Sequence, residues 1–281
     1  MHVGINISIS EQHGNFGALA RKMEEVGFES VWLPEHPVIP VHHNSKYGGT
    51  PDGSVPVGMR SLVNPLIALS YAAAATSSIR LGTAINLVTE HHPLDLAKQI
   101  ATLDMYSGGR FMFGIGTGWF REEAEALGVD FDHRGTQARE HVLAMKELWT
   151  KDEAEFHGRY VDFSAMYCYP KPAQKPHPPV LIGGSAKNVL NRVIQWGDGW
   201  IPIRVEPEEI KTARATLTRL AEEAGRDPAS IDITIHSQPA DRDMIMRFEE
   251  AGANRVLVRA SAPDHDSSLK EIEELAEKVL G

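Results

Sequence analysis

Residues 111–119 read Phe-Met-Phe-Gly-Ile-Gly-Thr-Gly-Trp, an apolar run that ends in three alternate glycines, Gly114, Gly116 and Gly118. The run predicts a strand, and glycines at its end let the backbone approach a ligand closely. Tight packing between strand and helix is the alternative, although it explains one glycine more easily than three. A dinucleotide fingerprint would need glycine in place of Trp119, and it would follow the first strand. This run is the fourth, so it argues against a Rossmann fold.

On both sides of this stretch, short apolar or β-branched runs alternate with segments of helical periodicity. Strands are expected at 3–8, 30–34, 79–86, 111–116, 179–183, 199–203, 231–236 and 255–259. Helices are expected at 16–26, 65–76, 93–106, 134–149, 186–196, 208–224, 241–250 and 267–280. Eight such repeats predict an α/β fold that closes as a (β/α)8 TIM barrel, because a doubly wound sheet usually needs fewer strands. We expect one domain over 1–281.

Two insertions interrupt the alternation, one after the second strand and one before the fifth. The first, 36–64, is rich in Gly, Pro and His; the second, 153–177, contains Phe-His-Gly-Arg-Tyr-Val-Asp-Phe, which predicts a hairpin. Both are expected at the mouth of the barrel. For the first, a lid over the site and a mobile surface loop both stay open.

Composition excludes several classes of function. The net charge of −10 argues against a nucleic-acid partner, because Lys and Arg must neutralise phosphates in such complexes. The single cysteine, Cys168, permits no intrachain disulfide and favours a reducing, cytoplasmic location. No signal peptide and no apolar run long enough for a membrane span are visible. We therefore expect no membrane partner.

Active sites of such barrels lie at the carboxyl ends of the strands, so the residues that end each strand are the candidates. Glu35 and His36 close the second strand, and a neutral imidazole can act as acid or base near pH 7. Ile182-Gly-Gly-Ser-Ala ends the fifth strand and is expected to open a helix. There Ser185 could cap the helix or bind a phosphate, and the two roles are compatible.

Other polar groups are expected to have ordinary roles. The histidines at 42, 43, 91 and 92 lack the spacing of a known metal motif, so no metal site is predicted. The glutamates of Arg121-Glu-Glu-Ala-Glu are expected to form a solvated helix face. Cys168 is expected to be a packed thiol.

Several motifs together closely resemble the luciferase-like monooxygenase superfamily. They are Leu81-Gly-Thr-Ala-Ile, His92-Pro, Ala97-Lys-Gln-Ile-Ala-Thr-Leu-Asp and Ser107-Gly-Gly-Arg. A further set resembles its coenzyme F420-dependent branch: Gly114-Ile-Gly-Thr-Gly-Trp-Phe-Arg-Glu-Glu, Ala126-Leu-Gly-Val, Arg134-Gly, Pro170-Lys-Pro, Pro178-Pro, Ile182-Gly-Gly and Gly197-Asp-Gly-Trp. The match spans about 3–236 and is strongest over 79–200.

The resemblance implies a barrel that binds F420, a deazaflavin that carries hydride, or in some relatives FMN. It implies a cofactor site formed by Ala84, Ile85, Asn86, Gly116, Thr117, Gly118, Gly183, Gly184 and Ser185, with a non-prolyl cis peptide at Ala84–Ile85. The pair Glu35-His36 matches the acidic residue and histidine of F420-dependent relatives, so His36 is the expected catalytic residue and Glu35 a substrate contact. Sugar-phosphate dehydrogenases of this branch carry glutamate where this chain has Trp119. Oxidation of a sugar phosphate is therefore disfavoured, and Trp119 is expected to stack on an apolar or planar substrate.

Three functions remain open at this point. The chain could be an F420-dependent enzyme that transfers hydride to or from a small organic substrate, an FMN-dependent monooxygenase served by a separate reductase, or a cofactor-binding barrel without turnover. The acidic tail of F420 would favour basic groups at the mouth, for which Arg121, Lys187 and Arg204 are candidates. A homodimer is expected, because relatives form one and a barrel exposes several helices.

Overall fold

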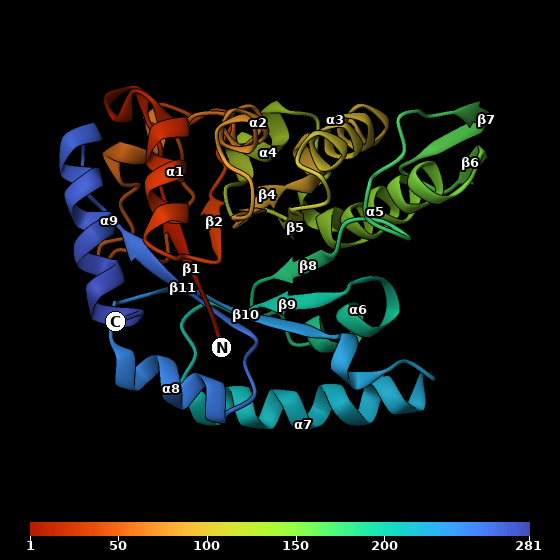
Figure 1. Cartoon of the computed structure of the whole chain (residues 1–281). Coiled ribbons are helices and arrows are strands. Elements are labelled where there is room, and N and C mark those ends of the chain that lie inside the picture. The colour runs from red at the N-terminus through yellow and green to blue at the C-terminus, as the bar shows by residue number, and fades with distance from the viewer.

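The computed structural model describes all residues, 1–281, and contains a closed parallel barrel surrounded by helices (Figure 1). The barrel strands are β1 (His2–Ile7), β2 (Ser30–Leu33), β3 (Arg80–Thr83), β4 (Asn86–Leu87), β5 (Phe111–Gly116), β8 (Val180–Gly183), β9 (Gly199–Ile201), β10 (Asp232–Gln238) and β11 (Arg255–Ala260). Their order is β3-β2-β1-β11-β10-β9-β8-β5-β4, and a pairing of β3 with β5 closes the ring. The predicted (β/α)8 barrel is confirmed.

The third barrel strand is divided into two short segments, β3 and β4. β3 pairs with β2 and β5, whereas β4 pairs with β5 alone. Between the segments lie Ala84 and Ile85, and the peptide bond that joins them is cis. The chain therefore bulges at the position that the family resemblance implies.

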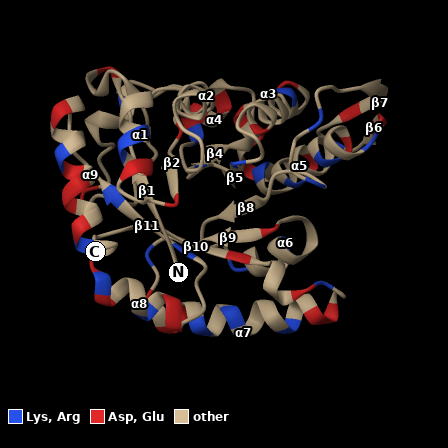
Figure 2. Ribbon diagram, in the orientation of Figure 1, with Lys and Arg blue, Asp and Glu red and all other residues tan.

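Helices cover the outside of the barrel at nearly the predicted positions. They are α1 (Phe16–Glu25), α2 (Pro65–Ala75), α3 (Pro93–Tyr106), α4 (Arg121–Ala126), α5 (Arg134–Thr150), α6 (Val189–Trp196), α7 (Pro207–Glu223), α8 (Arg242–Glu250) and α9 (His265–Val279). Single 3-10 turns lie at η1 (Glu11–His13), η2 (Val57–Ser61), η3 (Val88–Glu90), η4 (Phe131–His133) and η5 (Pro228–Ser230). The outer helices α7, α8 and α9 carry many charges of both signs (Figure 2), as solvent-facing helices do.

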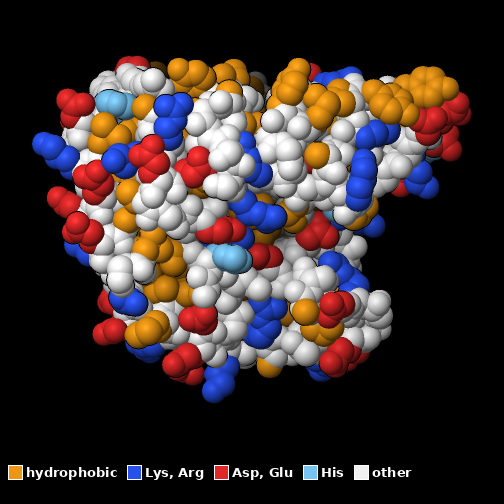
Figure 3. All heavy atoms as spheres, in the orientation of Figure 1, with side chains coloured by type: hydrophobic (Ala, Val, Ile, Leu, Met, Phe, Trp, Pro, Cys, Tyr) orange, Lys and Arg blue, Asp and Glu red, His pale blue; other side chains and the backbone are white.

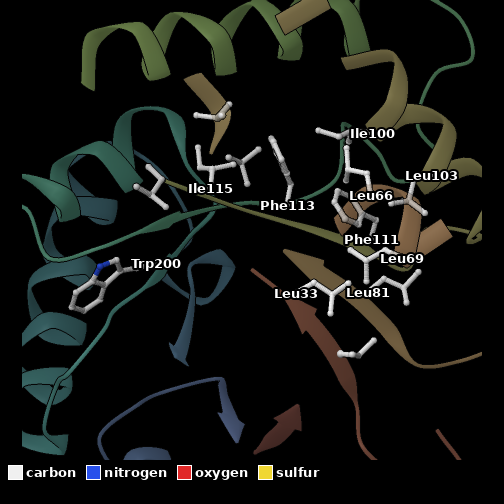
Figure 4. Close-up of a cluster of buried hydrophobic side chains, with 14 of the residues drawn as sticks. Leu33, Leu66, Leu69, Leu81, Ile100, Leu103, Phe111, Phe113, Ile115 and Trp200 are labelled. Carbon is white, nitrogen blue, oxygen red and sulfur yellow. The ribbon is translucent and has the colours of Figure 1, made fainter. Parts of the chain in front are cut away.

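The side chains of β5 alternate between two apolar layers. Phe111, Phe113 and Ile115 belong to the large core between the strands and the helices, where Leu66 of α2 and Ile100 of α3 also lie (Figure 4). The residues between them turn toward the barrel interior, which a second and smaller apolar cluster fills: Trp32, Ala84, Met112, Leu181, Ile201 and Leu257. The interior is thus packed below the level of the mouth.

The second insertion contains the predicted hairpin. β6 (Glu153–His157) and β7 (Asp162–Tyr167) pair antiparallel and extend away from the barrel beside α5 (Figure 1). Across the whole chain, no helix combines the length and the apolar character that crossing a membrane requires.

Candidate functional site

Ile85 follows the cis bond, and its side chain packs against the backbone of two glycines. A side chain at Gly116 would collide with the Ile85 Cδ1 atom, and a Cβ at Gly183 would lie 2.9 Å from Ile85 Cγ2. Ile85 is itself only partly buried. The absence of side chains at Gly116 and Gly183 therefore leaves room for the side chain of Ile85. This side chain forms an apolar surface that faces the mouth of the barrel, here called the apolar shelf.

The glycines of β5 do not all open toward a ligand. A side chain at Gly114 would collide with the Thr83 carbonyl and the Ile201 side chain, so packing explains that glycine. Gly118 has a left-handed φ of 73°, which a residue with a side chain rarely adopts. In the turn Gly116-Thr117-Gly118, the first glycine thus makes room for the Ile85 side chain, and the last has a backbone conformation that favours glycine.

His236 contacts the bulge from another strand. Its Nε2 atom lies 3.3 Å from the carbonyl oxygen of Ala84, the first residue of the cis bond. Burial lowers the pKa of His236, and the nearby Arg259 acts in the same direction. His236 is therefore neutral at pH 7 and can donate a hydrogen bond from Nε2 to this carbonyl.

His36 lies three residues after β2 and contacts a carboxylate from α4. Its Nδ1 atom is 2.6 Å from Oε2 of Glu123, and the exposed fractions of the two side chains are 8% and 0%. The glutamates after Arg121 were expected to face solvent, and for Glu123 this prediction was wrong. Helix α4 begins directly after the buried Phe120, which turns Glu123 inward toward β2.

Aromatic side chains surround His36. The Trp119 ring lies edge-on to the imidazole with 5.8 Å between centroids, and it stacks on Phe120 at 4.6 Å. Tyr47, from the first insertion, lies 5.3 Å from the Trp119 ring. Trp119 and Tyr47 are both partly exposed. They form an aromatic wall beside the His36 imidazole.

The first insertion is held to α4 by hydrogen bonds. Oε1 of Glu122 accepts from the backbone amides of Asn44 at 2.6 Å and Ser45 at 3.2 Å. Hydrogen bonding to the Ser45 side chain, followed by that to the Asn44 amide, lowers the pKa of Glu122 to about 2. The insertion also approaches the loop after β9, because Gly48 lies beside the guanidinium of Arg204 in that loop. The segment 36–64 therefore crosses part of the mouth, which favours a lid over a loop without contacts.

Glu35 does not offer a free carboxylate to a substrate. Its oxygens accept from Asn86 Nδ2 at 2.7 Å, from the Leu87 amide at 2.7 Å and from His91 Nε2 at 3.1 Å. Burial lowers the pKa of His91, but hydrogen bonding to Glu35 and its charge outweigh burial and raise it. The predicted substrate contact is thus corrected, because Glu35 braces the residues after the bulge. Asn86 keeps one buried oxygen, Oδ1, without a partner.

Glu90 is a second buried carboxyl group in this region. Neither of its oxygens has a hydrogen-bond partner, and a Cβ at Gly118 would lie 3.1 Å from Oε1. Burial raises the pKa of Glu90 to about 9, and the charges of Glu123 and Glu35 contribute. The side chain is therefore a neutral acid at pH 7.

The segment after β8 differs from its prediction. α6 begins at Val189 with Asn188 as its N-cap, so Ser185 is an exposed loop residue and does not cap a helix. Gly184 has a φ of 97°, and a Cβ there would meet no atom within 4 Å. The left-handed glycine delays the helix and leaves open space at the mouth.

The three basic candidates at the mouth differ in their availability. Arg121 is engaged by Glu125 at 2.9 Å and Asp132 at 2.5 Å, so it is not free for an acidic ligand. Lys187 and Arg204 make no ion pair. Arg204 has a left-handed φ of 53°, which is uncommon for a residue with a side chain.

The family model for luciferase-like monooxygenases matches residues 2–275 of this chain. The chain belongs to the luciferase-like family. The predicted redox enzyme with a flavin-type cofactor is thereby confirmed at the level of this family.

Relatives within the luciferase-like family include proteins that depend on F420 and on FMN. Uncharacterized proteins of Mycobacterium bovis and Mycobacterium tuberculosis are 38% identical over 99% of both chains. The F420-dependent glucose-6-phosphate dehydrogenase of Kineococcus radiotolerans is 30% identical over 79% of this chain and 62% of its own. The FMNH2-dependent dimethylsulfone monooxygenase of Pseudomonas putida is 34% identical over 53% and 44%.

A solved structure agrees with the fold of this family member. The monooxygenase RslO1 from Streptomyces bottropensis superposes with a TM-score of 0.76 at 20% identity, over 100% of this chain and 99% of its own. At this identity the likeness supports the barrel alone.

Sequence reasoning missed two residues of this region, Glu123 and Tyr47. Each reaches the site from a segment whose contacts are long-range, such as the 87 positions between His36 and Glu123. A helical reading of 120–126 that placed Phe120 and Ala124 on a buried face would have turned Glu123 inward as well.

Proposed function

We propose that this protein transfers hydride between coenzyme F420 and a small organic substrate, with His36 handling the accompanying proton. One observation carries the proposal: Ile85, seated on Gly116 and Gly183 after a cis bond, forms an apolar shelf within the same mouth as His36. A flat ring system needs an apolar surface against one face and polar groups near its reactive edge.

The residues present fit such a cofactor. The shelf would support the ring, and the open space at Gly184 with the turn at Thr117 and Gly118 would receive the phosphate. Asn86 Oδ1 is an unsatisfied acceptor beside the shelf, and Ala84 contributes the first half of the bulge. Bound there, F420 supplies the two-electron carrier.

The side chains of the chain itself supply binding and proton handling. His36 presents Nε2 without a protein partner, so this nitrogen can accept a proton from a bound substrate or return one to it. Trp119 and Tyr47 provide flat apolar surfaces for the substrate, so a substrate with a planar or apolar body is favoured. No residue of this wall is a carboxylate, which supports the exclusion of sugar-phosphate oxidation.

An FMN-dependent monooxygenase is the second candidate function. The similarity to the Pseudomonas putida enzyme favours it, although that match covers 53% of this chain. The shelf serves either ring, since both cofactors are tricyclic. The unpaired Arg204 and Lys187 suit an acidic tail, which supports F420.

The proposal is tested by the variant His36→Ala, once a panel of small alcohols and carbonyl compounds has yielded a substrate. Turnover is expected to fall by about 10² to 10⁴ while the cofactor dissociation constant changes little, because the other cofactor contacts lie on different strands. His42→Ala, an exposed histidine of the same insertion, is the control and keeps normal turnover. Near-normal turnover of a folded His36→Ala would refute the role, and a joint loss of stability and affinity would make His36 an anchor of the insertion.

A further inference from the structure

The imidazole of His36 has one hydrogen-bond partner in the protein. Nδ1 contacts Glu123, whereas Nε2 makes no hydrogen bond and is not among the buried polar atoms that lack one. An ionised carboxylate can only accept a hydrogen bond. When the carboxylate is ionised and the ring is neutral, the proton of His36 is on Nδ1, and Nε2 carries the free lone pair.

We infer that Glu123 is a positioning residue that fixes both the tautomer and the orientation of His36. The inference rests on the proposed function for its consequence in turnover. It adds a residue from α4 that contacts neither substrate nor cofactor and acts through the imidazole.

Both oxygens of Glu123 are engaged, which holds the carboxylate in one orientation. Oε2 accepts from His36, and Oε1 accepts from the backbone amide of Val38 at 3.3 Å. The donors are two residues apart at the start of the first insertion. The same carboxylate thus sets the direction of the imidazole and of the chain that follows it.

Neither the aromatic rings around His36 nor the adjacent carboxylate competes with Glu123 for the hydrogen bond to the imidazole. The rings of Trp119 and Phe120 lie edge-on to His36 at 5.8 and 6.4 Å, which restricts rotation of the imidazole. Glu35, the adjacent carboxylate, is occupied by Asn86, Leu87 and His91. Glu123 is the carboxylate that determines where the proton of His36 resides.

The decisive variant is Glu123→Gln, which keeps the size of the side chain but changes its hydrogen-bonding capacity. A carboxamide can accept from Nδ1 through its oxygen or donate to Nδ1 through its nitrogen. The second arrangement allows the tautomer with the proton on Nε2, which cannot accept from a substrate. We expect kcat to fall by about 10² or more, while KM and the cofactor dissociation constant change less than threefold.

The tautomer itself is measured on the cofactor-free protein by two-bond ¹H–¹⁵N correlation spectra of histidine-labelled samples near pH 8. His36 resonances are identified by their loss in His36→Ala. The unsubstituted protein is expected to show a protonated Nδ1 and an unprotonated Nε2. Glu123→Gln is expected to show mainly the opposite tautomer, because the Val38 amide would hold the carboxamide oxygen and leave the NH2 group facing Nδ1. Glu125→Gln, an exposed residue of the same helix, is the control and should match the unsubstituted protein.

An Nε2–H tautomer or an imidazolium in the unsubstituted protein would overturn the inference, and so would a tautomer that Glu123→Gln leaves unchanged. The tautomer of the unsubstituted protein is read with His36→Ala as the only variant, which serves for assignment, so the test stands even if Glu123→Gln fails to fold. Because it needs neither cofactor nor substrate, it can fail while F420 dependence holds, and F420 dependence can fail while it holds.

Discussion

The side chain of Ile85 occupies the space that a side chain on Gly116 would need. Gly116→Ala should therefore push Ile85 into the mouth and weaken cofactor binding roughly tenfold, as judged by fluorescence titration. The double variant with Ile85→Ala removes the collision and should recover part of the affinity relative to Gly116→Ala. If the effects of the two substitutions on the free energy of cofactor binding are additive, Gly116 does not position Ile85.

Gly184 is predicted to face the phosphate of the bound cofactor. Gly184→Val should weaken cofactor binding, because its side chain enters space that no protein atom occupies. The left-handed backbone adds a stability cost of about 1–2 kcal/mol. Gly225→Val is the matched control, since Gly225 also has a left-handed φ and open space around it. Equal affinities for the two folded variants would place the phosphate elsewhere.

Glu90 should make the stability of the protein depend on pH. Its pKa is raised to about 9, so the folded state keeps its proton while the unfolded state ionises above about pH 4.5. The stability that Glu90 contributes is complete below the unfolded pKa and is lost as pH rises toward 9. Glu90→Gln removes this loss of stability. At pH 8.5 the melting temperature of the variant should exceed that of the unsubstituted protein by about 5 °C or more, and at pH 4.5 the two melting temperatures should be nearly equal.

The comparison requires a glutamate that does not change its environment on folding. Glu274→Gln serves this purpose, because Glu274 is exposed on α9 and makes no ion pair. A difference in melting temperature for Glu90→Gln that is the same at both pH values would show that the carboxyl of Glu90 is ionised in the folded protein.

Helix α2 is predicted to form the interface of a homodimer. It contains no charged residue, and it exposes Ile67 by 73% and Tyr71 by 56%. Apolar side chains gather over α2 and α3 and toward the β6–β7 hairpin along one edge of the molecule (Figure 3). Light scattering at micromolar concentration should give a dimeric mass, and the double variant Ile67→Glu, Tyr71→Glu a monomeric one.

An exposed apolar residue outside this edge controls for the added charge. Met246→Glu on α8 should leave the dimer intact. A monomeric mass for the unsubstituted protein, or dissociation by Met246→Glu alone, would contradict an interface on α2.

The barrel could be predicted from the sequence because each of its elements carries a local signal. The run at 111–116 became β5, and the helix that opens at Pro93 begins at that residue. The helix after β8 was placed three residues too early, because the conformation of Gly184 is not visible in the order of residues. α4 has six residues, too few to show a buried face by periodicity.

Residues of the candidate site could be predicted from the sequence only where a single segment of the chain contains the whole motif. His36 and the bulge at Ala84–Ile85 follow from local motifs and the family resemblance. Glu123 and Tyr47 reach His36 and Trp119 across the mouth through contacts between segments distant in sequence. Glu35 has the residue type of a substrate contact, and only its three donors from the segment 86–91 show its bracing role.

The preference for F420 over FMN can be measured by titrating the purified protein separately with each cofactor and following fluorescence. We predict a dissociation constant for F420 in the micromolar range or tighter, about −8 kcal/mol or more favourable, and weaker binding of FMN. Micromolar or tighter binding of FMN without detectable binding of F420 would show that the protein does not depend on F420.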